Sequence, residues 1–190
     1  MARVICLVPH CGYLSSVSRM LEIYRALRER GVTPRVLTHG GTYERLLRDA
    51  GVSYDVAGPR MSEQRCAAFL QDEIGVGPAG QSMYTDAELR AYVLAEASYF
   101  RGHQITVAVT GFTLTTMLSA PLAAVRLVTE HAGSWVPPVF ERGLLPVPAR
   151  PVTPAMRFLP GPLARPLFNA AAPRMRHYCS GFNRVAAELG

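Results

Sequence analysis

Lysine is absent from this chain of 190 residues, so all 20 of its basic side chains are arginines. A P-loop needs a lysine after its glycines, and this class of nucleotide site is therefore excluded. The four cysteines are scattered without a Cys-x-x-Cys pair, which argues against a disulfide framework and a zinc site. No apolar run reaches the roughly 18–20 residues that span a bilayer, and no signal-peptide pattern opens the chain. We therefore expect a cytoplasmic protein without a metal site.

What the chain does have is the composition of an ordinary globular domain, with 49% hydrophobic and 18% charged residues. Its length suffices for one well-buried domain and is short for two. Cys6 lies within an apolar run and is predicted to be a small core residue. Cys11 follows that run, in the first loop after it, and for this residue a reactive thiol is an alternative to a core role.

The first fifty-six residues contain two strand–helix units in succession. The apolar run Arg3–Pro9 predicts a strand that ends in a Pro-His-Cys-Gly turn. An amphipathic helix pattern follows and stops at Gly31, and Pro34–Thr38 begins a second strand. A buried strand, an amphipathic helix and another strand form the βαβ unit of a parallel sheet. The predicted fold class is therefore α/β, a Rossmann-like parallel sheet with helices on both faces.

The alternation continues along the chain, with a two-helix excursion between the third and fourth strands. Such excursions line or cover a site more often than they fill a core. The further predicted elements are a helix from Thr42, its cap, to Gly51, a strand at Val52–Val56, helices at Ser62–Ile74 and Thr85–Phe100, a strand at Gln104–Val109, a helix at Thr113–Ala124 and a strand at Arg126–Glu130.

The last third of the chain differs in texture, because ten of the fifteen prolines fall within Trp135–Pro173. Prolines interrupt helices and sheets, so we expect this stretch to wrap over a surface. The segment from Arg142 to Arg184 holds seven arginines and no acid, and a helix is predicted at Pro173–Leu189. The expected organisation is a Rossmann-like ligand-binding domain at 1–134, a Pro/Arg-rich wrap at 135–172 and a closing helix at 173–190. The basic segment predicts a domain interface, with contact to an anionic membrane surface as the alternative. No nucleic-acid motif accompanies the charge, so no nucleic acid is expected.

Ligands of such folds bind in the loops at the carboxyl ends of the strands. His10–Ser18, His39–Thr42 and Thr110–Thr113 are these loops here. In the first of them His10 is a candidate general base, with a solvated or capping role as the alternative. Tyr13 shares the loop. Ser15 or Ser16 is expected to cap the helix, or to meet a ligand at its N-terminus.

A second group of candidates lies just past the last predicted strand. Glu130 and His131 precede a glycine, Ser134 and Trp135, the only tryptophan of the chain. An indole face suits sugars and flat aromatic ligands, and packing beneath the proline-rich stretch is the alternative. A literal Gly-x-G-x-x-Gly pattern at 75–80 follows a helix instead of a strand, so it is interpreted as a loop.

These features together resemble the N-terminal, acceptor-binding half of a GT-B glycosyltransferase of the macrolide/flavonoid UDP-glycosyltransferase type. Ser15–Gly31 aligns without a gap to the family's first helix, which begins at a Gly-His and ends in Arg-Gly. Thr110–Thr113 and His131–Pro138 resemble the family's acceptor-side loops. Phe182–Gly190 is similar to the helix that precedes its interdomain linker. The resemblance covers the chain but only half of the family's enzyme.

The resemblance implies roles for individual residues, and the chain departs from the family's pattern at two of these positions. The family's catalytic histidine corresponds to Ser16, and the aspartate that orients it corresponds to Thr110. A serine hydroxyl needs a neighbouring base to lose its proton. Either one of His10, His39, His131 and Glu130 has taken over the role, or the acceptor is activated differently, or the chain is inactive. The expected site residues are, for catalysis, His10, Ser16, Thr110 and His131, and, for substrate binding, Tyr13, Ser15, His39, Phe112, Glu130, Ser134 and Trp135.

The function expected from this resemblance is to hold a small-molecule acceptor, a hydrophobic natural-product hydroxyl, for sugar transfer. No cofactor is expected on this chain itself. A UDP- or dTDP-sugar donor is implied for the complete enzyme, on a C-terminal donor domain or a partner chain. The alternative is a non-catalytic helper or binding protein that retains the glycosyltransferase fold.

Overall fold

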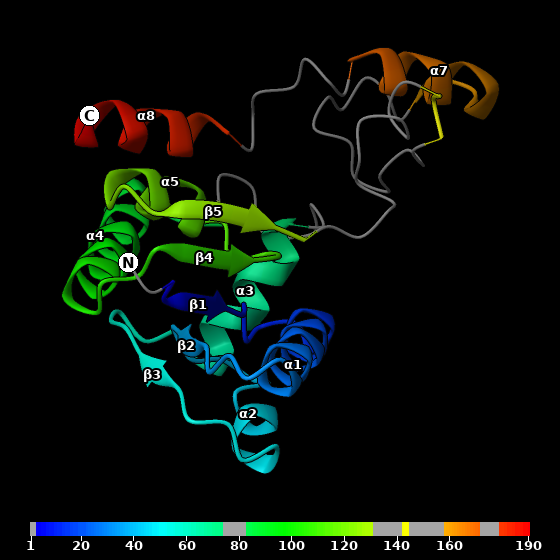
Figure 1. Ribbon diagram of the computed structural model, residues 1–190. Coiled ribbons are helices and arrows are strands. Elements are labelled where there is room, and N and C mark those ends of the chain that lie inside the picture. Colours follow the sequence, from blue (N-terminus) through cyan, green and yellow to red (C-terminus); the bar gives the residue numbers. More distant parts are fainter. Residues whose placement is uncertain (1–2, 74–82, 131–141, 145–157, 172–178) are drawn as a thin grey trace.

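Five parallel strands in the order β3-β2-β1-β4-β5 form the centre of the molecule in the computed structural model (Figure 1). The structure describes residues 3–73, 83–130, 142–144, 158–171 and 179–190. The strands are β1 (Ile5–Val8), β2 (Arg35–Thr38), β3 (Asp55–Val56), β4 (Val107–Thr110) and β5 (Arg126–Thr129). The α/β prediction is thereby confirmed. The strands at Arg3–Pro9 and Val52–Val56 were predicted too long, because only their central or last residues pair with neighbours.

Seven helices are found in the described part of the chain. They are α1 (Leu14–Glu29), α2 (Arg45–Asp49), α3 (Glu63–Glu73), α4 (Asp86–Gly102), α5 (Thr116–Leu122), α7 (Gly161–Ala171) and α8 (Ser180–Leu189). The long helix α4 starts with a capping box, in which the Thr85 hydroxyl accepts from the Glu88 amide and the Glu88 carboxylate accepts from the Thr85 amide.

Side chains that alternate along β1 build a separate apolar core on each face of the sheet. Leu7 packs with Val17 and Met20 of α1 on one face. Cys6 and Val8 point to the other face. There they pack with the α4 and α5 helices, notably with Phe100. Helices thus cover both faces, as the sequence predicted, and Cys6 is a fully buried core residue.

Two predicted helix caps are wrong. Helix α1 follows Tyr13, so Ser15 and Ser16 lie within its first turn, and the cap makes no side-chain hydrogen bond. Helix α2 begins only at Arg45, and the preceding Glu44 takes the cap position that was predicted for Thr42. Helix α1 thus begins earlier than predicted, whereas α2 begins later because the turn after β2 uses residues 42–44.

Helix α8 packs against α4 and α5, beside the α4 N-terminus (Figure 1). Its Val185 is fully buried, and Arg184 Nε lies 2.7 Å from the Asp86 carboxylate. Cys179, which falls within the helix predicted at Pro173–Leu189, is exposed just before the start of α8. Helix α7, within the proline-rich stretch, carries the exposed side chains of Leu163 and Leu167.

The described residues contain neither a membrane-spanning helix nor a cluster of metal ligands. None of the helices among them is long and apolar enough to cross a membrane. Within the same ranges, no three histidine, cysteine or acidic side chains gather as the ligands of a metal ion would.

Candidate functional site

Because all five strands are parallel, their carboxyl ends meet at one edge of the sheet, where such folds bind ligands. His10 follows β1 directly. Its Nδ1 accepts the Gly12 amide at 3.1 Å, so the proton of the neutral ring sits on Nε2. That Nε2 is buried and has no partner among the described residues. Burial, and secondarily the neighbouring His39 imidazole, lower the pKa of His10 from 6.5 to about 3. His10 is therefore a neutral ring that presents an unused N–H donor.

An aromatic cluster surrounds His10 and joins two strand ends. The Tyr13 ring lies 5.0 Å from the His10 ring and 4.8 Å from the Phe112 ring, both edge to face. Phe69 of α3 lies 4.8 Å from His10. The Tyr13 hydroxyl donates to the Glu73 carboxylate at the end of α3. Burial raises the pKa of Glu73, and the hydrogen bond from Tyr13 opposes this effect.

The two positions that correspond to the family's catalytic pair are turned toward the backbone. Ser16 is fully buried, and its hydroxyl accepts the His10 amide at 3.1 Å. Thr110 is also fully buried and lies opposite Val8 in the sheet. Its hydroxyl donates to the Val8 carbonyl at 3.0 Å and accepts the Thr113 amide at 3.3 Å. Both hydroxyls hold turns at the strand ends, and neither has a base beside it in the described hydrogen-bond pattern.

A carboxylate lies at the end of β5, next to the turn after β4. Glu130 is paired with Arg19 of α1, whose Nε is 2.8 Å from the carboxylate. A Cβ on Gly111 would stand 2.0 Å from Glu130 Oε1, so the turn needs glycine for the carboxylate to fit there. Ser15 is exposed in the first turn of α1.

His39, at the end of β2, makes its hydrogen bonds to other residues. Its Nε2 lies 2.7 Å from Oε1 of Glu96, and its Nδ1 lies 3.1 Å from the Ala57 carbonyl oxygen. Both side chains are buried. The sequence analysis did not identify Glu96 as a site residue. Its helical spacing nevertheless places it on the buried stripe of α4, together with Leu89, Val93 and Phe100.

Cys11 is not a reactive thiol in this fold. It is buried, and burial raises the pKa of its thiol to about 12, so it stays protonated at neutral pH. Thr38 donates to its sulfur at 3.1 Å.

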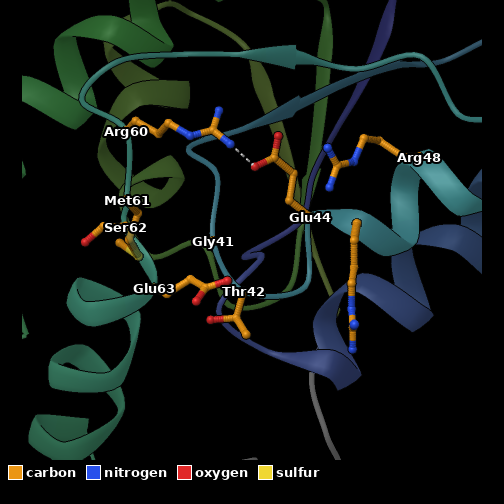
Figure 2. A pocket seen from close by; sticks show the side chains of 9 residues that line it. Gly41, Thr42, Glu44, Arg48, Arg60, Met61, Ser62 and Glu63 are labelled. Carbon is orange, nitrogen blue, oxygen red and sulfur yellow. Dashed lines mark hydrogen bonds and ion pairs between the residues drawn. The ribbon is translucent and has the colours of Figure 1, made fainter.

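A hollow of about 230 Å³ opens at the same edge, between the loop after β2 and the start of α3. Figure 2 shows Arg60 reaching across it to the Glu44 carboxylate, with which it forms an ion pair. The hollow is polar and open, and sequence reasoning had placed only its Gly41–Thr42 wall in a ligand loop. Its lining comprises Gly41, Thr42, Glu44, Arg45, Arg48, Arg60, Met61, Ser62 and Glu63.

The structure thus brings together some of the predicted site residues and separates others. His10, Tyr13 and Phe112 form one cluster, and Glu130 lies at the neighbouring turn. His39 belongs to a separate buried network. His131, Ser134, Trp135 and the glycine pattern at 75–80 lie outside the described residues. Glu73, which no periodicity singled out, joins the cluster through Tyr13.

Of three comparisons with known proteins, the search of solved structures gave matches. No family profile and no curated protein match the chain. Among solved structures, the spinosyn forosaminyltransferase SpnP matches the whole chain over 42% of its own length, with 13% identity and a TM-score of 0.53. The Streptomyces sp. SF2575 glycosyltransferase SsfS6 (TM-score 0.48, 14% identity) covers 68% of the chain and 39% of its own length, and it has also been solved with thymidine diphosphate. SnogD of Streptomyces nogalater covers 68% and 34%, with 16% identity and a TM-score of 0.43.

The match to SpnP is consistent with the α/β architecture, and the chain spans about two fifths of the length of SpnP. At such low identity the likeness concerns the fold alone. The chain has a Rossmann-like α/β fold that is similar to part of the fold of the glycosyltransferase SpnP.

Proposed function

We propose that this chain is the acceptor-binding part of a nucleotide-sugar-dependent glycosyltransferase. The single observation that carries the proposal is the His10 cluster: a buried ring with an unused N–H donor, walled by aromatic side chains, at the carboxyl edge of a GT-B-like sheet. Aromatic walls suit a hydrophobic acceptor, and a single donor suits an acceptor hydroxyl or carbonyl oxygen. The substrate class is therefore a hydrophobic natural product that carries a hydroxyl group.

In this function His10 binds and orients, and it does not remove the proton. Its Nδ1 lone pair is used by the Gly12 amide, and its Nε2 carries a hydrogen. The candidate bases that remain are Glu130, held by Arg19, and His131. Tyr13 and Phe112 form the wall against which the acceptor packs.

The sugar donor, a UDP- or dTDP-sugar, is proposed to bind a separate domain or partner chain. Transfer requires acceptor and donor in one geometry, so an acceptor site by itself does not catalyse transfer. Leu163 and Leu167 of α7, within a stretch rich in arginine and without acids, are the proposed contact surface for that domain, with an anionic membrane as the alternative. The proposed boundaries are those given by the sequence, at 134/135 and 172/173.

A second candidate function is a non-catalytic helper that keeps the acceptor-binding fold. One observation favours it: the side chains at the family's catalytic positions, Ser16 and Thr110, both bond to the backbone. Under this alternative, the cluster still binds the small molecule but presents it to another protein.

Calorimetry with the purified chain tests the proposal. A hydrophobic phenol such as 2-naphthol should bind, and Tyr13→Ala should weaken binding by about tenfold through loss of an aromatic wall. Tyr24→Ala, on the opposite part of α1, is the matched control and should leave the affinity unchanged. UDP-glucose and dTDP-glucose should produce no heat. Saturable binding of either sugar nucleotide by the chain alone would overturn the acceptor assignment.

The two candidate functions differ once a donor-binding domain is added. Sugar transfer to the phenol in that mixture supports the enzyme. Binding of the phenol without transfer, in a mixture that binds the sugar nucleotide, supports the helper.

A further inference from the structure

A fully enclosed polar network lies behind the carboxyl end of β2, and the proposed function makes no use of it. Its centre is Glu96, a carboxyl group of α4 with no exposed surface. It contacts three residues from two other elements: His39 after β2, and Thr115 and Ser119 at the start of α5 and within it. Isolated buried carboxylates are strongly unfavourable, so the partners must supply the protons that keep the charge in place.

The hydrogen-bond pattern fixes the protons of the network except the one between His39 Nε2 and Glu96 Oε1. The Ala57 carbonyl oxygen can only accept, so the His39 Nδ1 that lies 3.1 Å away carries a hydrogen. On the other side, the hydroxyls of Thr115 and Ser119 donate to the two Glu96 oxygens, one each. A carboxyl group that accepts several hydrogen bonds favours its ionised form.

The remaining proton lies between His39 Nε2 and Glu96 Oε1, which are 2.7 Å apart. A proton on Oε1 would make a neutral ring and a carboxylic acid, whereas a proton on Nε2 makes an imidazolium and a carboxylate. The two hydroxyls that donate to Glu96 favour the second arrangement, because they stabilise the ionised carboxylate. We propose that His39 is a buried imidazolium with both nitrogens protonated, paired with an ionised Glu96, and that this pair is a positioning device for the carboxyl end of β2. The pair is neutral as a whole, and it ties β2 to α4 and α5.

The groups packed around the pair add no other charge. The Tyr92 ring of α4 meets the His39 ring edge to face at 4.5 Å. The Glu96 charge is a secondary cause, after burial, of the raised pKa of Tyr84 and of the Cys6 thiol on β1, so both stay neutral. The positive charge of His39 in turn contributes to the lowered pKa of His10. His39 is thereby assigned away from ligand binding and acid–base work, and its charge adds to burial in keeping the neighbouring His10 neutral.

Only this last consequence rests on the proposed function, because it gives a role to His10. The proton count stands on the Ala57, Thr115 and Ser119 contacts alone. Failure of the acceptor-binding experiment would therefore leave the proton count untouched, and failure of the proton count would leave the acceptor experiment open.

Imidazole ¹⁵N–¹H correlation spectra of the full chain at pH 7.5 test the inference. We expect both His39 nitrogens to show the protonated shift and to couple to ring protons in the imidazolium pattern. A His39 ring with an unprotonated nitrogen at this pH would overturn the proposal. The wild-type spectrum decides by itself, so the result does not depend on a variant that folds.

The Glu96→Gln variant sharpens the test, because a glutamine amide can donate to a neutral Nε2 while its oxygen accepts from a hydroxyl. We expect His39 to lose one proton in this variant and to become the neutral ring with hydrogen on Nδ1. Glu188→Gln, at an exposed ion pair with Arg90, is the matched control and should leave the His39 spectrum unchanged. A His39 that stays doubly protonated in Glu96→Gln would contradict the assigned pairing.

Discussion

The ends of β1 and β2 lie side by side in the sheet, yet their histidines differ in one respect. Both nitrogens of His39 and both oxygens of Glu96 have partners. His10 is also buried, but its Nε2 has no partner among the described residues, and aromatic rings surround it. A polar group enclosed with all its bonds made stabilises the fold, whereas an enclosed donor without a partner costs free energy unless a ligand or water completes it. Under the proposed function, this difference distinguishes the structural residue His39 from the proposed binding residue His10.

The largest loss of stability is expected when Glu96 is removed from the buried network. Glu96→Ala leaves the His39 charge and two hydroxyls buried without their acceptor, and removal of one partner from a buried ion pair costs about 3–5 kcal/mol. We expect a loss of that order in the free energy of unfolding, measured by urea denaturation. Glu188→Ala, which removes an exposed partner of Arg90, should cost less than about 1 kcal/mol. Equal losses in the two variants would refute the role of Glu96.

The loop after β2 touches the loop after β1 at Gly41, which lies against the Cys11 backbone. Gly41 has φ +134°, and a Cβ there would stand 2.8 Å from the Cys11 backbone. Gly41→Ala therefore combines an unfavourable dihedral with a clash against a fixed main chain, at a cost of about 2–4 kcal/mol. Gly51→Ala, with φ +67° and open space around it, isolates the dihedral and should cost about 1–2 kcal/mol. Thermal unfolding distinguishes them, and equal midpoints would show that the Cys11 contact is loose.

The unpartnered ring should make stability depend on pH. In the unfolded chain His10 binds a proton as the pH falls below about 6.5, but in the folded chain only near 3. The unfolded state therefore holds more protons in this window, and stability falls with decreasing pH by up to about 1.4 kcal/mol per unit from this residue. His10→Gln should remove that slope, and His103→Gln should keep it. Denaturation curves between pH 4 and 7 give the slopes, and parallel slopes in His10→Gln and wild type would contradict the burial of a neutral ring.

The smallest expected effect on stability belongs to Gly111→Ala. Its Cβ would displace the Glu130 carboxylate, which stands at 2.0 Å, but the displaced group is the end of a movable side chain. We expect a stability loss of about 1 kcal/mol or less, since the exposed Arg19 pair contributes little. Sugar transfer by the complete enzyme should fall much more if Glu130 is the base. Gly102→Ala has nothing within 4 Å and is the control for both readouts. Unchanged transfer in Gly111→Ala would remove Glu130 from the candidate bases.

Sequence reasoning recovered the sheet, because short apolar strands alternating with amphipathic helices leave few topologies. It also found His10, Tyr13 and Phe112 by their positions after strands. It did not anticipate that His39 turns inward, since the position after β2 looks equivalent to that after β1. The decisive partner, Glu96, lies 57 residues away in the chain, and only the buried stripe of α4 marked it. Pairings across such separations depend on how helices dock, which local patterns do not encode.

The measurement that tests the account most directly is a titration of the ¹⁵N-labelled chain with 2-naphthol, followed in the imidazole and aromatic spectra. The account predicts saturable shifts of His10, Tyr13 and Phe112, with the doubly protonated His39 signal unmoved. Saturable shifts of His39 with a silent His10 would contradict it, because the complete network would then be the binding site.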